Sequence, residues 1–516
     1  MVESSSAAPS ERWLATVVRR AWEHSLKAGF FADGDDFFAC GGDSLTALAV
    51  VSEVAMATGL DVPAMWLYEN PRLDDAVRTL AAAADRGLAR IVPQEREGEH
   101  PLSFQQEGLL RVMDHICVGH RYQVAYAVEL PDGIDEVRLV AAATRLAGRH
   151  PALTSRISGR GVLARQKTAG TAGLELERVR ISHPNDVAAA TSWWAAPTIE
   201  LDGSLARLGL IGAQPRRVLA LSAHQMVMDP WSWGLILRDL AVLYNNPDAE
   251  SASALAYSDY ARWQRQHLSA AAHEHHLGYW RRAADGYPPG GVPLSGPQGE
   301  APPAGPAARF PLEVPAQDAR ALHAAGQAMS ASLFEMLLAL FHLAVGRWAG
   351  TRDVLVASAT ASRTRPGTED VAGFFVNGRF TRSDLTGART LGELTEHVRD
   401  RWRAGDAHRE LHLEKVLFDL GVPDVANVKF SLNAIPTLTA PTLGGERLSP
   451  VPVAGAPSAR RHVSVGLSPA AGGGLTGALT YRTDLLFPTQ VRTLAEEFLT
   501  LCRSAATAPS SARIAR

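Results

Sequence analysis

The sequence predicts a small all-α domain, followed by a larger α/β region that is divided into two lobes. Three observations support this prediction. Apolar residues recur at helical spacing over residues 11–83, whereas helical and strand-like patterns alternate after residue 101. A Pro- and Gly-rich stretch, residues 287–306, interrupts this alternation near its middle. A chain of 516 residues also has room for about three folded units.

The composition is that of a globular protein and excludes several classes of function. With 20% charged residues, a net charge of −3 and no run of like charges, the chain offers no basic surface for nucleic acid. Its three cysteines lie far apart, so they predict neither a disulfide framework nor a metal cluster and fit a reducing cytoplasm. No signal peptide and no apolar run of about 18 residues is present, so we expect a cytoplasmic protein without a membrane segment. Only four of the 51 basic residues are lysines (Lys27, Lys167, Lys415 and Lys429), which suggests a GC-rich gene rather than a function.

The small domain is predicted over residues 10–84. Its first helix covers residues 13–26, and a loop rich in Gly and Asp follows over residues 32–43. A second helix begins near Ser44, and a last helix runs from residue 73 to about residue 83, after an Asn-Pro start signal. About seventy residues in four helices can form one compact core, and the charged segment 85–100 is predicted to be a linker.

The larger region is predicted as an N-lobe over residues 101–286, a linker over 287–306 and a C-lobe over 307–508. In the N-lobe, residues 216–224 (RRVLALSAH) predict a buried strand, and residues 231–244 a helix. In the C-lobe the pattern predicts helix 333–348, strand 354–358 and a helix near 391–402.

The first chemical motif is Ser44 in the stretch DFFACGGDSL, residues 36–45. Two glycines let the backbone turn sharply, and a helix N-terminus favours a phosphate attached to the serine. An isolated Gly-Gly-Asp-Ser could equally be an ordinary helix cap. In its four-helix setting, however, the stretch 13–80 resembles a peptidyl carrier protein of nonribosomal peptide synthetases. That resemblance implies phosphopantetheine on Ser44, attached by a phosphopantetheinyl transferase and carrying acyl groups as thioesters.

The rest of the chain, about residues 100–505, resembles the condensation domain of the same synthetases. The likeness is carried by ordered stretches at residues 103–109 (SFQQEGL), 149–153 (RHPAL), 257–263 (YSDYARW), 373–377 (GFFVN) and 408–415 (HRELHLEK). The resemblance implies two chloramphenicol-acetyltransferase-like lobes that face a tunnel.

The family's active-site motif is His-His-x-x-x-Asp-Gly, and here it departs from the pattern. His224 and Asp229 match, but Gln225 replaces the second histidine, which the family uses at the reaction centre, and Pro230 replaces the glycine. An amide cannot accept a proton near pH 7, and general-base help is worth ~10²–10⁴ in rate, or roughly 3–5 kcal/mol. Gln225 could still orient an amine, and holding the two reactants together could supply much of the acceleration.

His224 and Asp229 are the other candidates at this site. A histidine at the end of a buried strand is usually structural, and on an extended segment His224 faces away from Gln225. In the family the Asp pairs with an arginine whose position here is Thr154, so we expect Arg156, two residues on, as a replacement.

Other features predict no additional chemistry. His408 and His412 have a helical metal-ligand spacing, but nothing in the motif completes a site, so we expect packing and no metal. The two glycines at 290–291 and the three at 472–474 have no nucleotide-binding context and predict loops. No adenylation domain or P-loop is recognisable, so we expect loading in trans by a separate adenylation domain or an upstream module.

Two functions remain open at this point. In the first, the chain is an acyltransferase that passes the acyl group from Ser44 to an amine, on a second carrier protein or on a small molecule, and forms an amide. In the second, the altered motif marks an inactive condensation-like domain that docks a tailoring enzyme, such as an oxygenase, to the loaded carrier. The residues involved in the first are Gln225, His224 and Asp229.

Overall fold

The computed structural model covers the chain with several gaps. It describes residues 11–27, 29–38, 40–42, 44–60, 62, 66–84, 91–94, 98–116, 122–168, 174–213, 216–249, 255–293, 304–360, 362–363, 365, 367–432, 441–451, 453, 458–470, 472–507 and 510–514.

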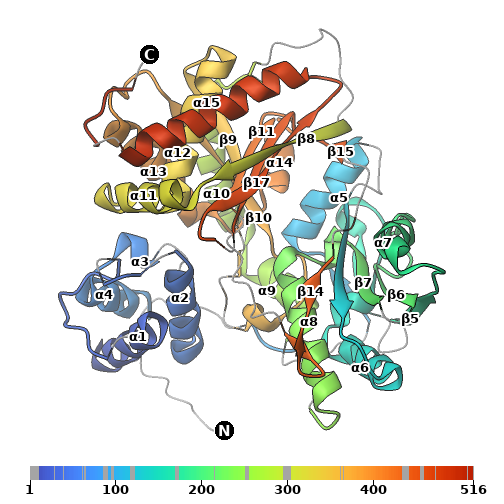
Figure 1. Cartoon of the computed structure of the whole chain (residues 1–516). Helices are drawn as coiled ribbons and strands as arrows, with labels where there is room; N and C mark the ends of the chain where they lie inside the picture. The colour runs from blue at the N-terminus through green and yellow to red at the C-terminus, as the bar shows by residue number, and fades with distance from the viewer. Residues whose placement is uncertain are drawn as a thin grey trace.

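The N-terminal unit consists of four helices, drawn in blue in Figure 1. They are α1 (Glu11–Leu26), α2 (Ser44–Thr58), α3 (Trp66–Glu69) and α4 (Leu73–Ala84), and they confirm the predicted all-α unit. Trp22 is fully buried at their centre, with its ring 5.6 Å from that of Phe31 and 5.1 Å from that of Phe37. The loop between α1 and α2 is therefore anchored by its own aromatic side chains.

The N-lobe is built on a five-stranded sheet with the order β14-β2-β7-β6-β5. Its own strands are β2 (Gln123–Leu130), β5 (Leu176–Val179), β6 (Ala206–Ala213) and β7 (Arg216–His224), the last with the predicted bounds. Helices α6 (Glu136–Arg149) and α8 (Pro230–Asn245) share one apolar core with the sheet, and α7 (Val187–Ala195) packs into a second core that includes other residues of β6 and β7. A small sheet of β1 (Glu99–Pro101), β4 (Arg165–Thr168) and β3 (Ser155–Ser158) lies beside α5 (Phe104–Ile116).

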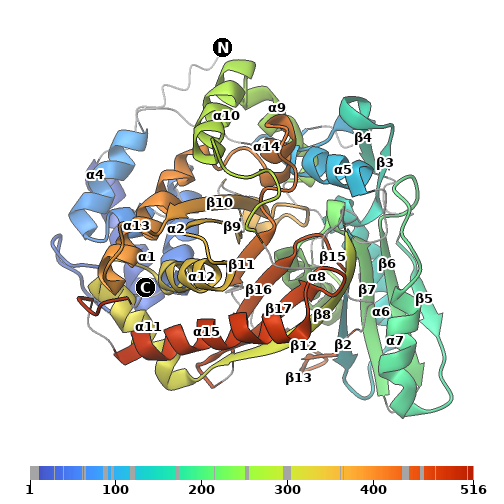
Figure 2. The same cartoon turned by 90° about the horizontal axis from the view of Figure 1, so that it is seen from above.

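The C-lobe is built on a seven-stranded sheet with the order β10-β9-β11-β16-β17-β8-β15. Its strands are β8 (Gly305–Val314), β9 (Asp353–Thr360), β10 (Asn377–Asp384), β11 (Val428–Leu432), β15 (Ser458–Ala459), β16 (Val463–Pro469) and β17 (Leu475–Arg482). The packing helices are α11 (Ala316–Ala328), α12 (Leu333–Ala349), α13 (Leu391–Ala404) and α15 (Pro488–Thr507). Figure 2 shows the N-lobe strands in teal and green on one side and the C-lobe strands in yellow to red on the other.

Helix α12 is the central helix of the C-lobe. Ser332 and Glu335 form a reciprocal capping box at its start, and Gly350 ends it in the left-handed conformation with φ of 66°. Most of its residues are buried, so its apolar sequence reflects a core position. Among the described residues no single helix is long and apolar enough to cross a membrane; α11 and α12 satisfy that test only as a pair bent by 98°.

Three helices connect the two lobes, and one strand crosses between them. The helices are α9 (Tyr257–His267), α10 (Ala270–Ala284) and α14 (Leu413–Asp419). After the short hairpin of β12 (Thr442–Leu443) and β13 (Glu446–Arg447), strand β14 (Ser449–Pro450) pairs antiparallel with β2. Figure 1 shows β14 in orange-red beside the blue and green N-lobe strands. The C-terminal half of the chain thus completes the N-lobe sheet.

Candidate functional site

Ser44 is the first residue of helix α2, at the end of the glycine-containing loop. Gly41 has φ of 98°, which favours glycine, and a Cβ on Gly42 would lie 2.3 Å from the ring of Phe37. The backbone therefore needs both glycines to deliver the chain to the start of α2. Asp43 and the side chain of Ser44 lie outside the described residues. A serine at a helix start behind such a turn fits an attached phosphate.

Asp229 is buried, and its carboxylate organises the loop after β7. It caps α8 by accepting from the backbone N–H of Ser232 at 2.8 Å and from its hydroxyl at 2.6 Å. Pro230 begins α8, and Asp229 itself is extended, with φ of −125° and ψ of 171°, as the proline predicts. The other carboxylate oxygen accepts from the N–H of Phe375, which brings the GFFVN stretch to the motif.

The cation beside Asp229 is Arg363, and the expectation for Arg156 is wrong. Nη2 of Arg363 lies 2.9 and 3.1 Å from the two carboxylate oxygens, and its guanidinium stacks 4.2 Å above the ring of Phe375. Arg156 is exposed on β3. Thr154 ends a 3₁₀ turn (Pro151–Thr154) before that strand begins, so the two-residue strand spacing does not apply between it and Arg156.

His224 and Gln225 lie in different surroundings, because His224 is the last residue of β7 and Gln225 begins the 3₁₀ turn that follows it. His224 is 1% exposed, and its Nδ1 accepts from the N–H of Met226 at 3.2 Å, which closes the 3₁₀ turn Gln225–Val227. Gln225 is partly buried and lines a cavity. Among the described residues its amide has no hydrogen-bond partner, so it is available to a ligand.

The cavity has a volume of about 350 Å³ and lies between the two lobes. The N-lobe contributes Leu109, Val112, Tyr122 and Gln225. The C-lobe contributes strand residues of β9, β11, β16 and β17 together with His412, Glu414, Arg460 and Arg461. A larger hollow of about 800 Å³ lies at the β10 edge of the C-lobe sheet, but no motif residue lines it. The smaller cavity is therefore the candidate site.

The separate sequence stretches meet around this cavity. The hydroxyl of Tyr257 donates to the carbonyl of Phe374 at 2.6 Å and forms a hydrogen bond with Ser103 at 2.7 Å. Asn377 donates to the carbonyls of residues 409 and 411 and accepts from the N–H of Leu413. Tyr257, Tyr260 and Trp263 are buried core aromatics. These contacts hold both walls of the cavity in place.

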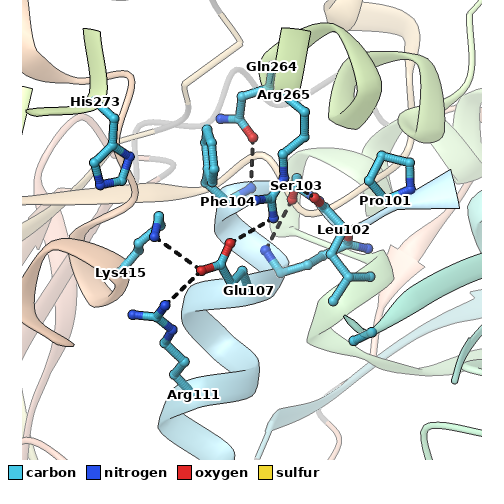
Figure 3. Close-up of polar contacts among 12 residues, drawn as sticks. Pro101, Leu102, Ser103, Phe104, Glu107, Arg111, Gln264, Arg265, His273 and Lys415 are labelled. Atoms are coloured by element: carbon cyan, nitrogen blue, oxygen red, sulfur yellow. Dashed lines mark hydrogen bonds and ion pairs between the residues drawn. The ribbon is translucent and has the colours of Figure 1, made fainter. Parts of the chain in front are cut away.

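A buried charge cluster also joins the lobes, and sequence reasoning missed it (Figure 3). Glu107 of α5 accepts from Arg265 at 2.7 Å, Arg111 at 3.0 Å and Lys415 at 3.1 Å. Lys415 of α14 also contacts Asp419, at 2.9 Å. Burial alone would raise the pKa of Glu107, but Lys415 and Arg265 outweigh it and lower that pKa. The sequence offered one signal for this cluster: Lys415, in the HRELHLEK stretch, is one of only four lysines in a chain with 51 basic residues.

The histidines of that stretch do not act together. His412 is buried on the cavity wall, and burial lowers its pKa to about 4. His408 instead groups with His275 and His276 of α10, with potential ligand atoms within 4.8 Å of one another. Burial, and then His276, lower the pKa of His408 to about 4, so its imidazole is neutral near pH 7. Among the described residues this trio is the set of side chains that could hold a metal ion.

Comparison with known proteins places these features in a family. A model of the condensation domain matches residues 96–513, and a model of the phosphopantetheine attachment site matches residues 13–80. The chain belongs to the condensation-domain family. Together the two matches show the carrier–condensation architecture of nonribosomal peptide synthetases, with the N-terminal helices as the phosphopantetheine-bearing carrier domain.

The similar curated proteins are much longer synthetases. The beauvericin nonribosomal cyclodepsipeptide synthetase of Gibberella fujikuroi is 27% identical over 535 aligned positions, which cover 98% of this chain and 16% of the relative. Malpinin synthetase of Mortierella alpina is 30% identical over 419, which cover 78% of this chain and 5% of the relative. The chain thus spans only a small part of the length of either relative.

Solved structures confirm the two-lobed α/β fold. The X-domain from teicoplanin biosynthesis has a TM-score of 0.73 at 21% identity. The aligned region covers 82% of this chain and 98% of the X-domain chain. The condensation domain of the Monacolin K polyketide synthase MokA has a TM-score of 0.70 at 17% identity. The aligned region covers 81% of this chain and 99% of the MokA domain chain. The predicted fold class is therefore confirmed.

Proposed function

We propose that the condensation domain transfers an acyl group from the carrier domain to an amine and forms an amide. The observation that carries this proposal is the cavity between the lobes. At the position of the motif it is lined by Gln225, whose amide has no hydrogen-bond partner among the described residues. When bound at Ser44, phosphopantetheine supplies a thiol at the end of a flexible arm, to which an acyl group is joined as a thioester. A separate phosphopantetheinyl transferase attaches the arm, and a trans-acting adenylation domain or an upstream module supplies the acyl group, in the cytoplasm.

In this reaction the amine nitrogen bonds to the acyl carbon while the carbon–sulfur bond breaks. The proton that the amine loses ends on the departing sulfur, so no external reagent is consumed. Gln225 positions the amine by accepting one of its N–H groups through the amide oxygen. Asp229 and Arg363 hold the loop that presents Gln225, and His224 fixes its turn. The acceleration comes from bringing the two reactants together rather than from a base.

The experiment follows the acyl group on the intact protein. The chain is loaded at Ser44 from an aminoacyl coenzyme A by a phosphopantetheinyl transferase, amine acceptors are added, and mass spectrometry records loss of the acyl mass and appearance of the amide. Ser44→Ala serves as the control that cannot be loaded. We expect Gln225→Ala to slow the transfer about tenfold, equal to one lost hydrogen bond to the amine. A loaded wild-type protein that transfers to no carrier-bound or free amine would refute the proposal, and an unchanged rate in Gln225→Ala would remove the positioning role.

A second candidate function is docking of a tailoring enzyme to the loaded carrier. Two observations favour it: Gln225 replaces the histidine of the motif, and the X-domain from teicoplanin biosynthesis, of similar fold, has been solved in complex with OxyB. The test is size-exclusion chromatography of the full chain with an oxygenase encoded beside it. A stable complex that Ser44→Ala retains, with no amide formed by the loaded protein, would favour docking. Separate elution together with amide formation would reject docking.

A further inference from the structure

We propose that the cavity between the lobes binds a carboxylate group of one of the two reactants, and that Lys429 is the cation that receives it. The inference rests on the proposed function in one respect, because it takes this cavity as the place where the reactants meet. It adds the chemical class of the substrate, an acid-bearing acyl group or amine, which the motif does not specify.

Lys429 is the one long side chain in a row of small ones on the cavity floor. In the C-lobe sheet it lies directly opposite Ala357 of β9 on one side and Ser464 of β16 on the other. Ser464 in turn lies opposite Thr480 of β17. All four residues line the cavity that Gln225 enters from the N-lobe. This row of the floor therefore consists of small side chains and one lysine.

The charged side chains near Lys429 form ion pairs with one another, and Glu414 acts on Lys429 only through its charge. Glu414 contacts both Arg460 and Arg461, at 2.5 and 2.6 Å, and Arg460 also faces Asp424 at 3.7 Å. In the described part of the chain the ammonium of Lys429 forms no hydrogen bond and no ion pair. Burial, and then the charge of Arg461, lower the pKa of Lys429, and the charge of Glu414 opposes this shift without reversing it. Among the described residues, Lys429 is thus a partly buried cation of this cavity that forms no ion pair of its own.

Keeping the Lys429 ammonium group in this position costs free energy unless a ligand pairs with it. Removing an ammonium group from water without a partner is unfavourable, and a charge-assisted hydrogen bond to a carboxylate offsets that cost. Lys415 shows the contrast, because Glu107 and Asp419 already pair with it within the protein. Of these two C-lobe lysines, Lys429 is the one left open to a ligand.

The position within the site favours a substrate carboxylate over the phosphate of the arm. Gln225 lines the same cavity of about 350 Å³, which is the size of a small-molecule site. The phosphate of phosphopantetheine lies at the opposite end of the arm from the thioester. If the acyl carbon lies near Gln225, the anion within reach of Lys429 belongs to the acyl group or to the amine.

The test measures binding without requiring any reaction. Ligand-observed NMR or calorimetry compares glutarate with its neutral diamide, glutaramide, on the full-length wild type, Lys429→Gln and Lys429→Arg. Lys167→Gln is the matched control, since it removes the same charge from an exposed strand position. We expect the wild type to prefer glutarate by at least about tenfold, Lys429→Gln to lose that preference, and Lys429→Arg and Lys167→Gln to retain it. The preference should also weaken as the pH rises through the lowered pKa of Lys429.

Two results would overturn the inference. One is a glutarate affinity that does not change in Lys429→Gln while thermal unfolding shows that variant to be folded. The other is a wild-type protein that binds phosphopantetheine more tightly than pantetheine, through Lys429, but does not prefer glutarate to glutaramide. That result would mean that Lys429 binds the phosphate of the arm and not a substrate carboxylate. Lys429-dependent glutarate binding in a protein that forms no amide would support the inference and refute only the proposed function.

Discussion

Nη2 of Arg363 lies 2.9 Å from one carboxylate oxygen of Asp229 and 3.1 Å from the other, across 134 residues of chain. Both side chains are almost fully buried, and Arg363 also donates to the backbone carbonyls of Thr368 and Val371. The pair therefore ties the motif loop of the N-lobe to the segment that leads into the GFFVN stretch. Its role is to fix the backbone on either side of the cavity.

Replacing Arg363 should be far more harmful than replacing Arg156. Arg363→Met leaves the Asp229 carboxylate buried without its cation, which should lower the free energy of unfolding by about 3–5 kcal/mol. Arg156→Met removes an exposed side chain and should change the free energy of unfolding by less than about 0.5 kcal/mol. Urea unfolding of both variants measures the difference. Equal losses would contradict the assignment of Arg363 as the partner of Asp229.

Local sequence patterns predicted the elements of the fold well, and pairings across the chain poorly. The strand 216–224 and the helices beginning at Ser44 and Leu333 follow from apolar periodicity and capping, which are properties of neighbouring residues. The partner of Asp229 could not be found in this way, because Arg363 lies in a different lobe. Strand β14 was not predicted for a similar reason. Its two residues are too few to show a periodicity, and their place beside β2 depends on tertiary contacts.

The candidate site shows the same division. The resemblance to a family pointed to Gln225. Its separation from His224 comes from the end of β7, because Gln225 begins the 3₁₀ turn after that strand. Nothing local indicated that Lys429 would stand alone on a floor of small residues, because that follows from the register of four strands. The grouping of His408 with His275 and His276 likewise depends on how α10 packs.

Glu107 should make the junction of the lobes sensitive to acid. Its folded-state pKa lies below the ordinary value of 4.5, so its stabilising contribution is present above about pH 4.5 and is lost as the pH falls through the lowered value. Glu107→Gln removes the carboxylate that pairs with Arg265 and one of the two that pair with Lys415, and should cost about 1.5–3 kcal/mol at pH 7. Urea midpoints between pH 3 and 7 measure both effects. The control, Glu274→Gln, breaks an exposed pair with Arg281 and should change little; a similar loss in the control would contradict the special role of Glu107.

Gly108 should be essential for the close approach of α5 to α14. A Cβ at this position would lie 2.6 Å from Nδ1 of His412 and 2.9 Å from the backbone nitrogen of Lys415. Gly108→Ala should therefore destabilise the protein by about 1–3 kcal/mol, although alanine favours the helix itself. Gly278→Ala in α10 is the matched control, because its nearest new contact is an ordinary 3.6 Å to the end of Arg282. Thermal unfolding of the two variants should move in opposite directions, and a Gly108→Ala protein as stable as the wild type would show that the helices can separate freely.

Gly42 should control loading of the carrier domain through the shape of the loop before Ser44. A Cβ at Gly42 would overlap the buried ring of Phe37, 2.3 Å away, and that ring packs against Trp22 in the core. Gly42→Ala must therefore displace either the aromatic anchor or the start of α2, and either change moves Ser44 away from its place at the helix N-terminus.

Gly29→Ala is the control, since nothing lies within 4 Å of its new Cβ. With a phosphopantetheinyl transferase and coenzyme A, intact-protein mass spectrometry should show rapid loading of the control and loading slowed by at least tenfold in Gly42→Ala, a barrier increase of about 1.4 kcal/mol. Equal loading rates would mean that the transferase does not depend on this loop, and the loop would then serve only the packing of the four helices.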